Sequence, residues 1–200
     1  MFLPVPLYRQ SSPLDCGPTN VRMVTAFLEK DVGIERIREL IDLKDGQGVS
    51  TIKLAIAAAK LGFSTSFYST SLFFDTTHGD LDFYKEHGDL NLEASKKLVR
   101  EAEENKVDLH EQSLSLEDLL SFVNNKSIPI VLLDWSVIDE RVKGYMGHFV
   151  PIVGYDEEMV YVHNIGVDYG RENMPIKRET FERARKAKGT DEDILVISKK

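Results

Sequence analysis

The sequence predicts an α+β fold, with helices in the first part of the chain and strands in the last part. Apolar residues recur at helical spacing between residues 16 and 61, whereas most strand-length apolar runs lie beyond residue 126. No internal repeat or Gly/Ser-rich linker divides the 200 residues, which are enough to bury one sizeable core. We therefore expect a single domain, 1–200, with a mainly helical half at 1–62 and a sheet half at 126–200.

The helical half begins with an extended segment, because three prolines before residue 14 disfavour a regular helix there. A helix is then predicted from Cys16 to Lys30, since Pro18 suits the first helical turn and apolar residues follow at helical spacing. Two more helices are expected over residues 34–43 and 50–61. The prediction thus places the single cysteine of the chain where an extended segment meets a helix.

The middle of the chain is less regular. Residues 69–92 form an irregular insertion, which is either a substrate-gating lid or, as we slightly prefer, a variable surface loop. A charged amphipathic helix is predicted at 92–105, and a shorter helix after Ser115, where Ser115 and Asp118 form a capping pattern.

Strands are predicted by apolar runs and by alternation, and two of them form a hairpin around the turn Asp156–Glu158. A basic helix is expected over residues 178–188, before the closing strand. The predicted strands cover residues 63–68, 107–111, 128–134, 148–155, 159–163 and 194–198.

Composition narrows the class of protein. Acidic residues outnumber basic ones 33 to 25, for a formal net charge of −8, which argues against a nucleic-acid partner. The apolar runs are too short to span a membrane, and the first residues lack the apolar core of a signal peptide. One cysteine makes no internal disulfide, which fits a reducing, cytoplasmic location. The oligomeric state stays open.

Cys16 is the first candidate functional residue. A lone cysteine is often only a small core residue, but the helix start at Cys16 offers unpaired N–H groups that favour a thiolate. Gly17 leaves room for a substrate carbonyl beside the sulfur, and Asp15 is expected to cap the helix. The backbone N–H of Cys16 and the side-chain amide of Gln10 would make a two-donor oxyanion hole.

A cysteine nucleophile also needs a base and a group that orients the base. His148 begins a predicted strand, and Asn164 ends the next strand of the hairpin, sixteen residues later. Antiparallel strands of about this length place both positions at the same end of the sheet. The amide oxygen of Asn164 would then accept the Nδ1–H of His148 and fix its ring.

Three segments of the chain resemble the papain-like cysteine peptidase superfamily. They are QSSPLDCGPTN around Cys16, GHFVPIVGYD around His148 and VYVHNIG around Asn164. They are most similar to the bacteriocin-leader-processing peptidases, which cut after a double glycine, and to stand-alone relatives of these. The six residues from Gln10 to Cys16 and the sixteen from His148 to Asn164 match that superfamily. The middle of the chain is also similar to a subgroup labelled guanylyl-cyclase-like proteins.

This resemblance implies a papain-like fold, an N-terminal helical half packed on a C-terminal antiparallel sheet. It implies that Cys16 is the nucleophile, His148 the general base and acid, Asn164 the orienting residue and Gln10 the oxyanion donor. The expected activity is hydrolysis of a peptide or amide bond in a peptide or protein, through a thioester and with no metal or cofactor.

The orienting position stays open, because the leader-processing peptidases usually carry aspartate where this chain has Asn164. Asp168 is the second candidate for that role, and His163 is also close in sequence.

Three other functions are alternatives to hydrolysis. The same Cys–His pair also supports acyl transfer to an amine, and a fold that has lost catalysis would be a binding module. Nucleotide cyclisation is disfavoured because the sequence has no glycine-rich phosphate loop. A metal site at His78 and His87 is disfavoured because no cysteine pair accompanies them.

Overall fold

The computed structural model describes residues 2–43, 46–73, 76–87, 91–166 and 170–200. Its helices are α1 (Cys16–Leu28), α2 (Ile34–Leu40), α3 (Thr51–Lys60), α4 (Asp82–His87), α5 (Leu92–Glu104), α6 (Leu116–Ser121) and α7 (Arg178–Arg185), with short 3₁₀ turns η1 (Thr76–Asp80) and η2 (Trp135–Val137). Its strands are β1 (Ser64–Ser69), β2 (Asp108–Glu111), β3 (Ser127–Asp134), β4 (Gly147–Tyr155), β5 (Met159–Asn164), β6 (Arg171–Lys177) and β7 (Ile194–Ser198).

Seven strands of the described residues form one sheet, in the order β2-β1-β7-β3-β4-β5-β6. β1 and β2 run parallel, and every other neighbouring pair is antiparallel. The strands of the C-terminal part are therefore antiparallel to one another, as predicted, and β1 and β2 extend the sheet beyond β7. The α+β, papain-like fold class is confirmed.

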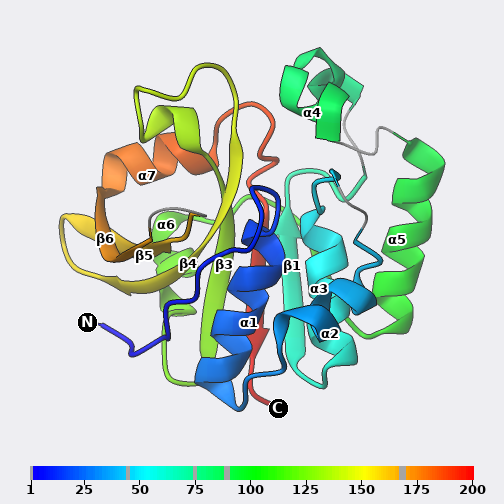
Figure 1. Ribbon diagram of the computed structural model, residues 1–200, viewed down its shortest axis with the longest axis horizontal. Coiled ribbons are helices and arrows are strands. Elements are labelled where there is room, and N and C mark those ends of the chain that lie inside the picture. The colour runs from blue at the N-terminus through cyan, green and yellow to red at the C-terminus, as the bar shows by residue number, and fades with distance from the viewer. Residues whose placement is uncertain (1, 44–45, 74–75, 88–90, 167–169) are drawn as a thin grey trace.

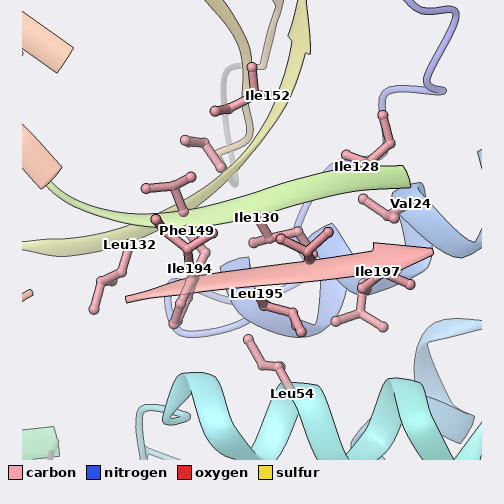
Figure 2. Packing of buried hydrophobic residues seen from close by; sticks show 14 of the residues in the cluster. Val24, Leu54, Ile128, Ile130, Leu132, Phe149, Ile152, Ile194, Leu195 and Ile197 are labelled. Atoms are coloured by element: carbon pink, nitrogen blue, oxygen red, sulfur yellow. The ribbon is translucent and has the colours of Figure 1, made fainter. Parts of the chain in front are cut away.

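Helices α1 and α3 lie against the sheet, α1 over β4 and β3 and α3 over β1 and β7 (Figure 1). Leu54 of α3 and Leu195 of β7 are fully buried, and in Figure 2 their side chains point toward one another. β3 lies between β7 and β4 and is buried along its whole length, which explains its nearly continuous apolar sequence. The core therefore sits between α1, α3 and the central strands.

The structure adds elements that the sequence pattern does not predict. β6 pairs with β5, but it is an exposed edge strand with mostly polar residues, so it lacks an apolar run. Two short helical elements, η1 and α4, lie inside the insertion at 69–92. The predicted cap of α6 is confirmed, since the Ser115 hydroxyl accepts the Asp118 N–H at 3.1 Å.

In the described part of the chain, no helix combines the length and apolar character needed to cross a membrane.

Candidate active site

A cavity of about 360 Å³ lies where the N-termini of α1 and α3 meet the start of β4, and both Cys16 and His148 line it. The insertion contributes to this cavity through Phe83 and Tyr84 of α4. The insertion is therefore more than a peripheral surface loop, because part of it forms a wall of the cavity that holds the cysteine.

Cys16 is the first residue of α1 and is buried, with 8% of its surface exposed. Asp15 occupies the N-cap position, but its side chain makes no capping hydrogen bond, contrary to our expectation. The carboxylate instead accepts a 2.5 Å hydrogen bond from the Ser11 hydroxyl and lies 3.5 Å from Arg38 Nε. The acid next to the cysteine thus anchors the preceding loop to α2.

Burial raises the pKa of the Cys16 thiol, because the low-dielectric surroundings disfavour the thiolate. The backbone N–H groups of Phe149, Gly17 and Cys16 act in the opposite direction, and the charge of Asp15 adds to the rise. The expectation that the helix start favours a thiolate is therefore only half right. The donors are present, but desolvation of the buried thiol outweighs them.

The side chains of His148 and Asn164 meet at the ends of β4 and β5, where His148 Nε2 lies 3.2 Å from Asn164 Oδ1. This corrects the expected ring nitrogen: Nε2, and not Nδ1, faces the asparagine. Trp135 packs edge-on against the imidazole, with ring centroids 4.8 Å apart. Burial lowers the pKa of His148 to about 4, although the Asn164 contact opposes this shift. The imidazole is therefore neutral at pH 7.

Asn20 joins the helix of the cysteine to the strand of the histidine. It is fully buried, and its Nδ2 donates 2.8 Å hydrogen bonds to the carbonyls of Cys16 and Phe149. The first bond runs back one turn along α1, and the second crosses to β4. Sequence reasoning missed this residue; the available signal was an amide side chain four residues after Cys16 on an otherwise apolar helix face.

Gln10 is buried, with 7% of its surface exposed, and its Nε2 donates a 2.9 Å hydrogen bond to the Ser12 carbonyl. Its Oε1 is buried and has no hydrogen-bond partner among the described residues. The amide carries a second hydrogen besides the one that it donates to Ser12. Cys16 and His148 line the cavity itself, whereas Gln10 and Asn164 are not among its lining residues.

The remaining candidates have other positions. His163 is fully buried and its Nε2 lies 2.8 Å from the Val5 carbonyl, so it does not orient His148. Asp168, the second candidate for that role, lies outside the described residues. His78 Nε2 lies 3.0 Å from Asp191, and His87 Nδ1 lies 3.2 Å from the Gly46 carbonyl. Within the described residues, no group of three or more His, Cys, Asp or Glu side chains is placed to hold a metal ion.

Solved structures with this fold are cysteine peptidase domains. They include a putative C39-like peptidase from Bacillus anthracis, with a TM-score of 0.58 and 17% identity over 98% of this chain and 96% of that one. The peptidase domain of Streptococcus ComA, a bifunctional ABC transporter involved in a quorum-sensing pathway, has a TM-score of 0.54 and 16% identity over 98% and 99%. A double-glycine-motif protease from an AMS/PCAT transporter, in complex with its leader peptide, has a TM-score of 0.54 and 16% identity over 100% and 94%. The fold is therefore that of the double-glycine peptidases.

Comparison of the amino-acid sequence with known protein families shows to which family the chain belongs. The model described as guanylylate cyclase matches residues 5–197, and the chain belongs to this family. It is also 26% identical over 208 residues to Guanylyl cyclase 1 of Arabidopsis thaliana, an alignment that covers 97% of this chain and 75% of that protein. Both resemblances stated from the sequence, to the peptidases and to the cyclase-like subgroup, are confirmed.

Proposed function

We propose that the chain is a thiol hydrolase that cleaves a peptide or amide bond through a Cys16 thioester. The observation that carries this proposal is the hydrogen-bonded pair of His148 and Asn164 beside a cavity that Cys16 also lines. In this proposal the 200 residues act as one papain-like unit on a peptide or protein, in a reducing, cytoplasmic setting that keeps the thiol free.

The proposed mechanism begins with a neutral pair. His148 takes the thiol proton of Cys16 as the sulfur attacks the substrate carbonyl, and the oxyanion accepts hydrogen bonds from the Cys16 N–H and the Gln10 amide. The C–N bond then breaks, and the imidazolium gives its proton to the leaving amine. Water, deprotonated by His148, hydrolyses the thioester and restores the thiol. Asn164 holds the imidazole in place through both steps.

A thiol and an imidazole that are both uncharged in the resting protein suit this mechanism. The buried thiol and the buried imidazole both have pKa values shifted toward their uncharged forms. In this proposal the ion pair therefore forms as the sulfur attacks an electrophile, and not in the resting protein. The backbone N–H groups of Cys16, Gly17 and Phe149 support the thiolate at that moment.

Two other activities are tested beside hydrolysis. Acyl transfer uses the same thioester and differs only in whether an amine or water attacks it. Guanylyl cyclase activity is suggested by the family description and by the name of the Arabidopsis relative. The lining of the cavity weighs against a nucleotide there, because the carboxylate of Asp191 would repel its phosphates.

The test is acyl-enzyme formation with p-nitrophenyl acetate, followed by intact mass and by the release of p-nitrophenolate. We expect a burst of product and an acetyl group on Cys16, absent in Cys16→Ala. Methylamine added to the reaction separates acyl transfer from hydrolysis by its product. GTP incubated with either protein tests the cyclase. Cyclic GMP formed equally by wild type and Cys16→Ala, with no acyl-enzyme, would overturn the hydrolase proposal.

A further inference from the structure

The cavity beside Cys16 has a mostly apolar lining that extends well past the two candidate catalytic residues. Its walls come from α3, β1, the insertion and α5, so they enclose more room than the reacting carbonyl needs. Apolar side chains that line it include Val49, Ile52, Phe67, Leu72, Phe83 and Leu98.

The tyrosines that line the cavity contribute their aromatic rings to it, because their hydroxyl groups are hydrogen-bonded within the protein. Tyr84 and Tyr145 both direct their hydroxyl groups to the carbonyl of Gly189, at 2.5 and 2.7 Å. Their rings stack with centroids 5.5 Å apart, and Phe83 meets Tyr145 edge-on at 5.7 Å. Since the hydroxyl groups are engaged, the three residues form one aromatic wall.

The carboxylates of the lining are also engaged with protein groups. Asp193 Oδ2 accepts a 2.5 Å hydrogen bond from the Thr51 hydroxyl, and Asp191 lies 3.0 Å from His78 Nε2. The other oxygen, Asp193 Oδ1, is buried and has no hydrogen-bond partner among the described residues. A polar ligand group would have to compete with the contacts of Asp193 Oδ2 and Asp191, whereas an apolar group would not.

We propose that this cavity is the subsite for a bulky apolar side chain, aromatic or branched aliphatic, carried by the substrate next to the carbonyl that Cys16 attacks. The inference rests on the proposed function, because a thioester at Cys16 is what makes the cavity a substrate site. A glycine at that position would leave the cavity of about 360 Å³ unfilled. Burying an aromatic side chain there removes its apolar surface from water.

The first experiment measures binding without catalysis. Isothermal titration of the Cys16→Ala protein compares N-acetyl-phenylalanine amide with N-acetyl-glycine amide. We expect the phenylalanine compound to bind at least about tenfold more tightly, from the burial of one large side chain. Equal affinities, or binding of neither compound, would overturn the subsite. Because this protein has no thiol, the result does not depend on whether the chain is a hydrolase.

The second experiment measures selectivity at the thiol. Wild-type protein is labelled with N-acetyl-phenylalanyl and N-acetyl-glycyl chloromethyl ketones, each rate being divided by its rate with glutathione. We expect the corrected ratio to favour phenylalanine by about tenfold or more. A ratio near one contradicts the subsite. Tight amide binding to Cys16→Ala together with an inert thiol in wild type would leave the subsite standing and overturn the hydrolase.

Variants locate the effect in the cavity. Phe83→Ala removes part of the aromatic wall, and Ala94→Phe on α5 adds a large side chain to the cavity lining. Both should reduce the preference for phenylalanine over glycine. Phe2→Ala is the matched control, because Phe2 is 55% exposed and packs against Tyr161 instead. An equal loss of preference in Phe2→Ala would contradict the assignment.

Discussion

The side-chain amide of Asn20 on α1 donates a hydrogen bond of 2.8 Å to the carbonyl of Phe149 on β4. Phe149 follows His148 directly, and the other amide hydrogen of Asn20 binds the carbonyl of Cys16 at the same distance. One buried side chain therefore joins the helical turn of the proposed nucleophile, Cys16, to the strand of the proposed base, His148.

We predict that Asn20→Ala slows turnover by a factor on the order of 10 to 10², because small displacements of reacting groups are costly. It should also lower the free energy of unfolding by about 1–3 kcal/mol, since two buried carbonyls lose their partner. Asn105→Ala is the matched control: its Nδ2 makes the same backward bond, to the Glu101 carbonyl, at the far end of α5. Peptide hydrolysis and urea unfolding measure both effects. Equal turnover in the two variants would remove Asn20 from the site's support.

The orienting residue is tested by comparing Asn164→Ala with His148→Ala. In the proposed mechanism Asn164 contacts the imidazole and takes no proton, so its loss should reduce turnover less than loss of the proposed base does. Steady-state kinetics of both proteins provide the comparison. A larger loss in Asn164→Ala would mean that a different group holds the ring and that Asn164 has another role.

Gln10 is expected to increase turnover by donating a hydrogen bond to the oxyanion that forms during the reaction. We predict that Gln10→Ala lowers turnover on the order of 10²- to 10³-fold, as loss of one such donor does elsewhere, with little change in KM. Gln10→Glu should be no better, because a carboxylate repels the oxyanion. Turnover unchanged in both variants would restrict Gln10 to its observed bond with the Ser12 carbonyl.

Asp193 makes stability depend on pH. Burial raises its pKa to about 7, so between about pH 4 and 7 the folded protein holds a proton that the unfolded chain has lost. Its contribution to stability is therefore complete at low pH and is lost as the pH rises through 7. His148, whose pKa is lowered to about 4, acts in the opposite sense: its contribution is complete above about pH 6.5 and is lost on acidification.

The variant Asp193→Asn distinguishes the stability contribution of Asp193 from that of His148, because it keeps the shape of the side chain without its charge. Wild type loses the contribution of Asp193 as the pH rises from 5 to 8, and the variant has no such loss. We therefore expect the difference in unfolding free energy between the two proteins to change in favour of the variant over this range, by on the order of 2–4 kcal/mol. Urea midpoints at the two pH values measure the gain. The same difference between the proteins at both values would mean that Asp193 does not titrate in this range.

The sequence was sufficient for those parts of the fold and site that depend on local pattern. The order of helices and strands, the Ser115 cap and the antiparallel strands of the sheet half follow from periodicity and turn residues. The meeting of His148 and Asn164 follows from hairpin geometry, because two positions at the open ends of paired strands must lie side by side.

The rest depends on packing that the local pattern does not encode. β6 has too polar a sequence to be distinguished from a loop, and it becomes a strand because β5 offers an edge. The Cys16 thiol is buried among segments that are distant in the sequence, and this burial reverses the pKa shift expected from the helix start alone. The bond from Asn20 to Phe149 spans 129 positions, so only the folded chain reveals it.

The central claim is that Cys16 and His148 act as one chemical unit, and the rate of iodoacetamide alkylation tests it most directly. The chain has a single cysteine, so every alkylated molecule reports on Cys16. Across pH 6 to 9 we predict that wild type reacts at least about tenfold faster than His148→Ala near pH 7, because the imidazole accepts the thiol proton. Identical rate profiles for the two proteins would mean that Cys16 is a structural cysteine, and would contradict the account.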